Sequence, residues 1–152
     1  MSTPHIELSA TEGKPFLDSF VQTNMFNNQE SDYLKSQFLM RVATASRSGR
    51  PNVVPVGYEF DGKYFYTGSI KREILRASPR NLNIKSGNKR VALVIDDLVS
   101  VDPWKPRGIR VNGVADLVTR DGEFGKTEYI RIKPRLSWSW GLAESRTKTI
   151  WK

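Results

Sequence analysis

Apolar residues recur first at a helical spacing and later at a strand spacing along this chain. Four apolar residues between Phe16 and Val21 predict a helix from Pro15 to Asn24, after a flexible leader over Met1 to Thr11. Asn27 to Glu30 is polar and indicates a loop. Tyr33, Leu34 and Phe38 then predict a second short helix that begins near Ser31.

From Arg41 the pattern changes to that of strands. RVATAS, a polar loop around Gly49, and NVVPVGYEF from Asn52 predict a hairpin. Pro55 places the second run at a sheet edge, because proline cannot donate to a central ladder. Asp61-Gly62 predicts a turn before the strand KYFYTG, which begins at Lys63.

The second half predicts one more helix and the longest strands. Ser78 is a typical N-cap with Pro79 at the first helical position, which predicts a helix from Pro79 to Ser86. The apolar run RVALVID predicts a central strand. Gly108 to Thr119 alternates with period two, Asp121-Gly122 turns the chain, and TEYIRIKP follows as a further strand.

These elements predict a mainly β fold, a split β-barrel of about six mostly antiparallel strands with two or three short helices. At 152 residues the chain is expected to form one domain. No apolar run reaches the roughly 20 residues of a membrane helix, and the start lacks a signal-peptide pattern. The chain has no cysteine, which fits the reducing cytoplasm, and we expect a cytoplasmic protein.

Charge and residue types narrow the chemistry. Lys plus Arg exceed Asp plus Glu by 24 to 16, a net charge of +8 that favours an anionic partner. The single histidine, His5, lies near the terminus. With no cysteine beside it, we expect neither a zinc site nor a Ser-His-Asp hydrolase.

Three segments are candidates for binding. Ser78 and Arg80 at a helix start suit a phosphate group, and Thr67 ends the preceding strand nearby in sequence. A second phosphate candidate is the run from Gly68 to Arg72. From local sequence alone, an ordinary capped helix with a solvated arginine is the favoured explanation of the segment at Ser78.

The loop from Asp102 to Gly108 contains two prolines that stiffen it, so that Trp104, Lys105 and Arg107 stand at fixed positions. It indicates a binding rim for an anionic group, or else a rigid barrel corner with solvated cations. Trp138 and Trp140 share one face of a strand, where they can wall a flat ring or pack in an interface.

The ordered set of YTG, ASPRN, DDLVSVDPWKPRGIRVNG and YIRIKPRLSWSWGL resembles the pyridoxamine 5'-phosphate oxidase-like split β-barrels, which bind flavin or deazaflavin cofactors. The segment around DPWKPRG is similar to the subgroup that uses coenzyme F-420. The resemblance covers about Tyr33 to Leu142.

The resemblance implies a homodimeric oxidoreductase that transfers hydride or electrons between its cofactor and a small organic substrate. No catalytic residue is named, because the chemistry resides in the cofactor. Coenzyme F-420 is favoured over FMN, since its acidic tail suits the cations of the loop, but the choice stays open. The implied cofactor-binding residues are Val54, Pro55 and Val56 beside the ring, Thr67, Gly68, Ser78 and Arg80 at the phosphate, Lys105 and Arg107 at the tail, and Trp140 as a wall.

Two other function classes remain open from the sequence. Basic charge with interleaved tyrosine and tryptophan is also found in barrels that bind single-stranded nucleic acid, although the cations here are dispersed. A carrier or sensor that binds a cofactor without turnover, including a heme protein, is the other alternative. We expect no membrane partner.

Overall fold

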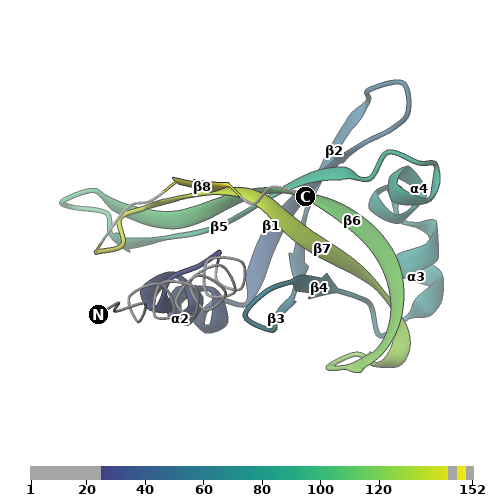
Figure 1. Cartoon of the computed structure of the whole chain (residues 1–152), viewed down its shortest axis with the longest axis horizontal. Coiled ribbons are helices and arrows are strands. Elements are labelled where there is room, and N and C mark those ends of the chain that lie inside the picture. The colour runs from purple at the N-terminus through teal and green to yellow at the C-terminus, as the bar shows by residue number, and fades with distance from the viewer. Residues whose placement is uncertain (1–24, 144–146, 150–152) are drawn as a thin grey trace, which may run out of the picture.

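The computed structural model of the protein describes residues 25–143 and 147–149. Within them, one antiparallel sheet of eight strands curls round an apolar core, and three short helices pack against it (Figure 1). The predicted mainly β, antiparallel architecture is confirmed, with eight strands in place of about six. The predicted leader and the helix from Pro15 to Asn24 lie outside the described residues.

The order of strands shows how the sheet becomes a barrel. Along the sheet the strands are β2 (Pro51–Gly57), β1 (Leu39–Ala45), β5 (Arg90–Ser100), β6 (Lys105–Gly122), β7 (Gly125–Trp140), β4 (Phe65–Thr67) and β3 (Glu59–Phe60), and β8 (Thr147–Thr149) also pairs with β7.

The first and last strands of this order, β2 and β3, are separated in the chain by Tyr58 alone, so the sheet must bend until its two edges meet. There Thr67 Oγ1 donates a hydrogen bond of 2.9 Å to the Gly57 carbonyl. The edges thus meet through a side chain, as expected of a split barrel. Pro55 lies in the edge strand β2, as predicted.

The long hairpin of β6 and β7 changes register between Asn112 and Gly113, which marks a β-bulge. A Cβ atom on Gly113 would lie 2.5 Å from the Lys133 carbonyl oxygen, so only glycine allows the strands to approach so closely here. On one side of the bulge the hairpin forms an arm, and on the other it forms barrel wall (Figure 1).

The interior follows the predicted alternation. Ile109, Val111 and Ala115 of β6 are fully buried, and Ile130 and Ile132 of β7 are at most 1% exposed. At the end nearest α2, aromatic rings close the core. Phe60 stacks on Phe65 with centroids 4.8 Å apart, and Phe26 meets both rings edge-on.

Helix α2 (Asn28–Ser36) begins three residues before the predicted start. Asn27 Oδ1 accepts from the Glu30 backbone N–H at 2.8 Å, and Glu30 Oε2 accepts from the Asn27 N–H at 2.9 Å. The expected loop from Asn27 to Glu30 was therefore wrong, because its polar residues form a capping box. Phe38, expected on the helix, follows it and is 85% exposed.

Helix α4 (Pro79–Lys85) confirms the predicted helix to within one residue, whereas α3 (Arg72–Ala77) was not predicted. Asn83 Nδ2 donates to Thr44 Oγ1 at 2.9 Å and Asn88 Nδ2 donates to the Ser46 carbonyl at 3.2 Å, which holds α4 and its exit on β1. Figure 1 shows α3 and α4 at one end of the molecule and α2 at the other.

We predict that Gly113→Ala lowers the free energy of unfolding by about 1–3 kcal/mol, the usual cost of overpacking. The reason is the rigid Lys133 carbonyl, which cannot move aside as a side-chain end would. Gly57→Ala is the matched control, since its new methyl group would have no neighbour nearer than 3.7 Å. Urea unfolding measures both, and equal stabilities for the two variants would contradict the bulge as the reason for glycine.

Candidate functional site

One face of the sheet points away from the core and crosses five strands. Directly paired residues place their side chains on the same face, so the pairing defines rows across the sheet. The central row runs through Pro55, Arg41, Val94, Arg110 and Trp138. We call this surface the outer face; in its central row Val94 and Trp138 are half-buried, whereas Pro55, Arg41 and Arg110 are exposed.

The two tryptophans lie on the outer face as the sequence predicted. The Arg110 guanidinium stands 4.0 Å over the Trp138 ring, a cation–π contact. Trp140 lies opposite Gly108, where a Cβ atom would be 2.5 Å from Trp140 Cζ2. The absence of a side chain at Gly108 therefore leaves space for the Trp140 ring beside β6.

Next to this row, a groove of about 480 Å³ runs over small side chains. Its floor includes Ala43, Ala92 and Gly113, and Arg90 and Arg135 are among its lining residues. It contains none of the predicted cofactor-binding residues.

At the start of α4 the predicted phosphate residues differ in what they can offer. The Ser78 hydroxyl donates to the Leu75 carbonyl at 2.6 Å and accepts from the Asn81 N–H at 3.3 Å, so its proton is engaged in capping. Arg80 Nε and Asn81 Oδ1 are buried and have no hydrogen-bond partner among the described residues. Burial also lowers the pKa of Arg80. An oxyanion beside Arg80 would satisfy the buried N–H and offset the loss of hydration.

The other residues expected near the cofactor occupy the seam of the barrel. Thr67 is fully buried and its hydroxyl donates to Gly57, so it contributes to closure of the sheet. Gly68 packs closely against the Tyr129 ring: a Cβ atom added to Gly68 would lie 3.0 Å from two ring carbons of Tyr129. Val54 and Val56 pack against the core, whereas Pro55 is exposed. One backbone edge of β2 has no strand beside it in the described sheet.

The loop expected from Asp102 to Gly108 is shorter than predicted. The turn comprises Val101 to Trp104, and Lys105 already belongs to β6, because the hairpin continues nearly to its tip. Trp104 and Lys105 are exposed, as expected of a rim. The Asp102–Pro103 peptide bond is cis.

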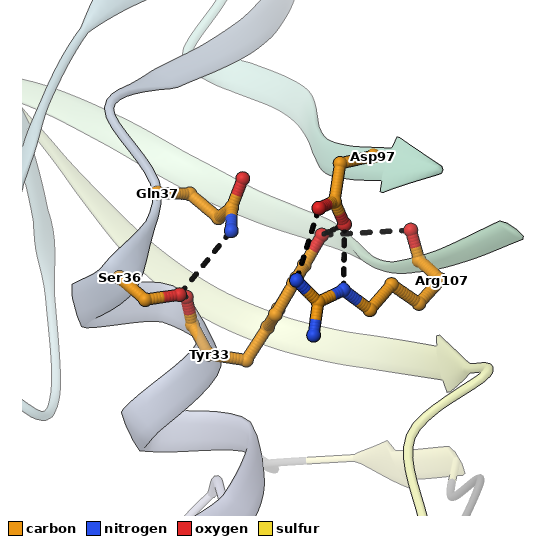
Figure 2. Close-up of polar contacts among 5 residues, drawn as sticks. All are labelled: Tyr33, Ser36, Gln37, Asp97 and Arg107. Carbon is orange, nitrogen blue, oxygen red and sulfur yellow. Dashed lines mark hydrogen bonds and ion pairs between the residues drawn. The ribbon is translucent and has the colours of Figure 1, made fainter. Parts of the chain in front are cut away.

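Arg107 is not a solvated cation, as one interpretation of this loop assumed, because it is paired with Asp97. Figure 2 shows its guanidinium facing Asp97, with Nε–Oδ1 and Nη2–Oδ2 distances of 2.8 and 3.0 Å. The Tyr33 hydroxyl, from α2, donates to Asp97 Oδ1 at 2.9 Å, and the Arg107 guanidinium lies 5.0 Å from the Tyr33 ring centroid. The three side chains tie the arm to α2.

The opposite charges of Arg107 and Asp97 in this cluster compensate each other. The hydrogen bonds from Arg107 hold the pKa of Asp97 below its usual range, and the same contact raises the pKa of Arg107. Burial, followed by the bond to Asp97, raises the pKa of Tyr33. Beside it, Ser36 Oγ donates to the Tyr33 carbonyl and Gln37 Nε2 donates to Ser36 Oγ, which fixes the end of α2 (Figure 2).

Sequence reasoning missed the partners of Arg107. Asp97 and Arg107 are direct partners in the β5–β6 ladder, but the register shifts between Leu98 and Ser100, so counting outward from the turn would have paired Arg107 with Leu98. The contact with Tyr33, 64 residues from Asp97, left no local signal either.

The structure does not bring the two predicted cation groups together within one chain. Strand β5 leads from the end of α4 to the turn at Trp104, and its 11 residues span roughly 33 Å at 3.3 Å per residue. Figure 1 shows α4 and this turn at opposite ends of the molecule. Lys105 and Arg80 of one chain therefore cannot hold the same small ligand.

In residues 25–143 and 147–149, no group of three or more His, Cys, Asp or Glu side chains could hold a metal ion. No helix in this part of the chain is both long and apolar enough to cross a membrane.

Comparisons with known proteins agree with the expected fold. A 5a,11a-dehydrotetracycline/5a,11a-dehydrooxytetracycline reductase from Streptomyces rimosus is 32% identical over 121 residues, covering 77% of this chain and 84% of that protein. A solved F-420 reductase aligns with a TM-score of 0.54 at 17% identity, covering 74% of this chain and 98% of that one. The heme storage protein of Vibrio cholerae aligns with a TM-score of 0.54 at 14% identity, covering 78% and 89%.

Because the two solved structures are only 17% and 14% identical to this chain, they show a shared fold and no more. Their names also indicate different ligands, F-420 for one and heme for the other. Membership rests on a separate comparison. Residues 26–140, three-quarters of the chain, match the model of the family described as pyridoxamine 5'-phosphate oxidase, and the chain belongs to that family.

Proposed function

We propose that the protein is an oxidoreductase that binds a flavin-type cofactor, coenzyme F-420 or FMN, and transfers hydride between it and a small organic substrate. The observation that carries the proposal is the 32% identity to a reductase over 84% of that enzyme's length. When bound, either cofactor supplies the hydride chemistry. The protein's own residues bind it, orient it and exclude water.

Arg80 carries the phosphate end of this proposal. Its buried, unpartnered Nε needs an acceptor, and a phosphate oxygen provides one together with negative charge. Ser78 holds the start of α4, on which Arg80 stands, through its capping bonds. The free backbone edge of β2 at Val54 to Val56 is suited to hydrogen bonds with the rim of a flat ring.

We predict that Arg80→Ala weakens cofactor binding by roughly 1.5–3 kcal/mol, the range for hydrogen bonds to charged groups, or about 10- to 150-fold in Kd. Titration followed by cofactor fluorescence measures the loss. Arg76→Ala, an exposed arginine of the neighbouring helix α3, is the matched control and should bind as the parent does. Parent-like binding by Arg80→Ala would refute the phosphate assignment.

Lys105 distinguishes the two cofactors. FMN ends at its phosphate, whereas coenzyme F-420 continues into a carboxylate tail that an exposed lysine can attract. Because Arg107 is already paired with Asp97, only Lys105 of these two cations is available for a tail.

Lys105→Glu is therefore expected to weaken coenzyme F-420 binding several-fold and leave FMN binding unchanged. The effect should shrink above 0.1 M salt, where charges are screened over about 10 Å. Lys126→Glu, at an exposed lysine beyond the bulge, controls for the change in net charge. Equal losses for both cofactors would show that Lys105 does not contact the tail.

The outer face supports a homodimer. A twofold axis through its middle, at Val94, would bury Val94 and Trp138 against the partner and relate opposite ends of the two chains. Lys105 of one protomer would then approach Arg80 of the other, whereas α4 and the turn before Lys105 lie at opposite ends of one chain (Figure 1). In this arrangement each cofactor is held by both protomers.

Sedimentation velocity tests the dimer. The parent should sediment at twice 17.3 kDa, and Val94→Arg should sediment as the monomer because it places an unpaired charge in the interface. Ile74→Arg, on exposed α3, should remain dimeric. A monomeric parent at micromolar concentration would refute the interface, and a heme band in its visible spectrum would favour the heme-binding alternative.

A further inference from the structure

A hollow of about 390 Å³ opens at the seam of the barrel, and none of the residues assigned to the cofactor lines it. It lies where the end of α2, the junction of β2 and β3, and the β6–β7 turn come together. Its volume falls within the usual range of small-molecule sites, which is about 300–1,000 Å³. Its apolar lining is mainly aromatic and comprises Leu34, Phe38, Tyr58, Phe60 and Phe124.

Phe38 is the unusual member of this lining. Its side chain is 85% exposed, and it follows directly on the polar end of α2. A large apolar side chain at the rim of a hollow favours binding of an apolar ligand, because the ligand removes that surface from water. Phe124 lies across the hollow on the β6–β7 turn and is half-buried.

Hydrogen bonds hold both walls in place. The Tyr58 hydroxyl donates to the Leu34 carbonyl and so fixes α2 against the β2–β3 junction. On the other wall, the Phe124 N–H donates to the Tyr129 hydroxyl at 2.9 Å, and the Glu123 N–H donates to Glu59 Oε2 at 3.2 Å. A rigid hollow of this kind costs a ligand little ordering free energy.

The rim adds polar groups of both signs. Lys35 and Glu123 lie on opposite walls, and Gln37 Nε2 donates a hydrogen bond to Ser36 Oγ. Lys35 is exposed, and its ammonium group can attract an acidic oxygen on a ligand. The hollow combines aromatic walls with one cation, Lys35, and two carboxylates, Glu59 and Glu123, of which Glu59 is paired with Arg120 at 3.1 Å.

Gly57 places this hollow beside the proposed cofactor. It lines the hollow and is the residue directly after Val56, at the end of the β2 edge. We infer that the hollow binds the substrate, and that the substrate is a flat polycyclic molecule with acidic phenol or enol oxygens. The inference rests on the proposed oxidoreductase function, because a ring held along β2 would then face such a substrate.

Binding of tetracycline to the full-length protein tests the inference, with the ligand's own fluorescence as the readout in metal-free buffer. Phe38→Ala and Phe124→Ala should each raise Kd roughly tenfold, the loss expected when a large aromatic contact is removed. Lys35→Ala should raise it less. Ile70→Ala, an 84% exposed apolar residue outside the lining of the hollow, should leave Kd unchanged.

Phe38→Ala is the decisive variant, because an exposed side chain can be removed without loss of folding. Phe124 is half-buried, so the folding of Phe124→Ala is checked by circular dichroism. Unchanged Kd in Phe38→Ala, or no binding by the parent at millimolar tetracycline, overturns the inference. Displacement of tetracycline by equimolar citrate would also overturn it, because citrate has the charge but no rings.

Cofactor titrations separate this result from the proposed function. If FMN and coenzyme F-420 bind but tetracycline does not, the oxidoreductase proposal stands and the hollow is not the substrate site. If neither cofactor binds while Phe38→Ala weakens tetracycline binding, the hollow binds polycyclic ligands and the oxidoreductase proposal fails, and with it the substrate role of the hollow.

Discussion

The bulge at Gly113 is the constraint on which the rest of the structure depends. It lets one continuous hairpin serve as barrel wall on one side and as a projecting arm on the other. The arm presents the outer face with Trp138 and Trp140, whereas the barrel end carries the turn with Phe124. A straight hairpin of this length could not close the barrel at β4 and also reach beyond it to Tyr33.

The seam between β2 and β3 is the second consequence of that bend. Closure by the Thr67 hydroxyl instead of a full ladder leaves the β2 backbone edge open, and it leaves a hollow beside Gly57. In a fully paired barrel, neighbouring strands would occupy both places. The same incomplete closure therefore accounts for the place proposed for a cofactor ring and for the place inferred for its substrate.

How far the sequence could predict this molecule depended on whether the signal was local. The alternation in β6, the cap at Ser78 and the edge position of Pro55 are local, and all three are confirmed. The capping box at Asn27 is local too, but its polar residues also suit a loop. The pairing of Arg107 with Asp97 and Tyr33 depends on hairpin register and on tertiary packing, so composition alone suggested a free cation.

Charge at the candidate site is divided between cations that are already satisfied and cations that are not. Arg107 forms an ion pair with Asp97, and Arg110 lies over the Trp138 ring. Both contacts stabilise the arm. Arg80 has a buried N–H without a hydrogen-bond partner among the described residues, and Lys105 is exposed near the tip of the arm, at the opposite end of the molecule from α4. Of these four cations, Arg80 and Lys105 have no acidic or aromatic partner among the described residues, so the proposed anionic ligand would gain most beside them. For the binding proposed here, the net charge of +8 matters less than the positions of Arg80 and Lys105.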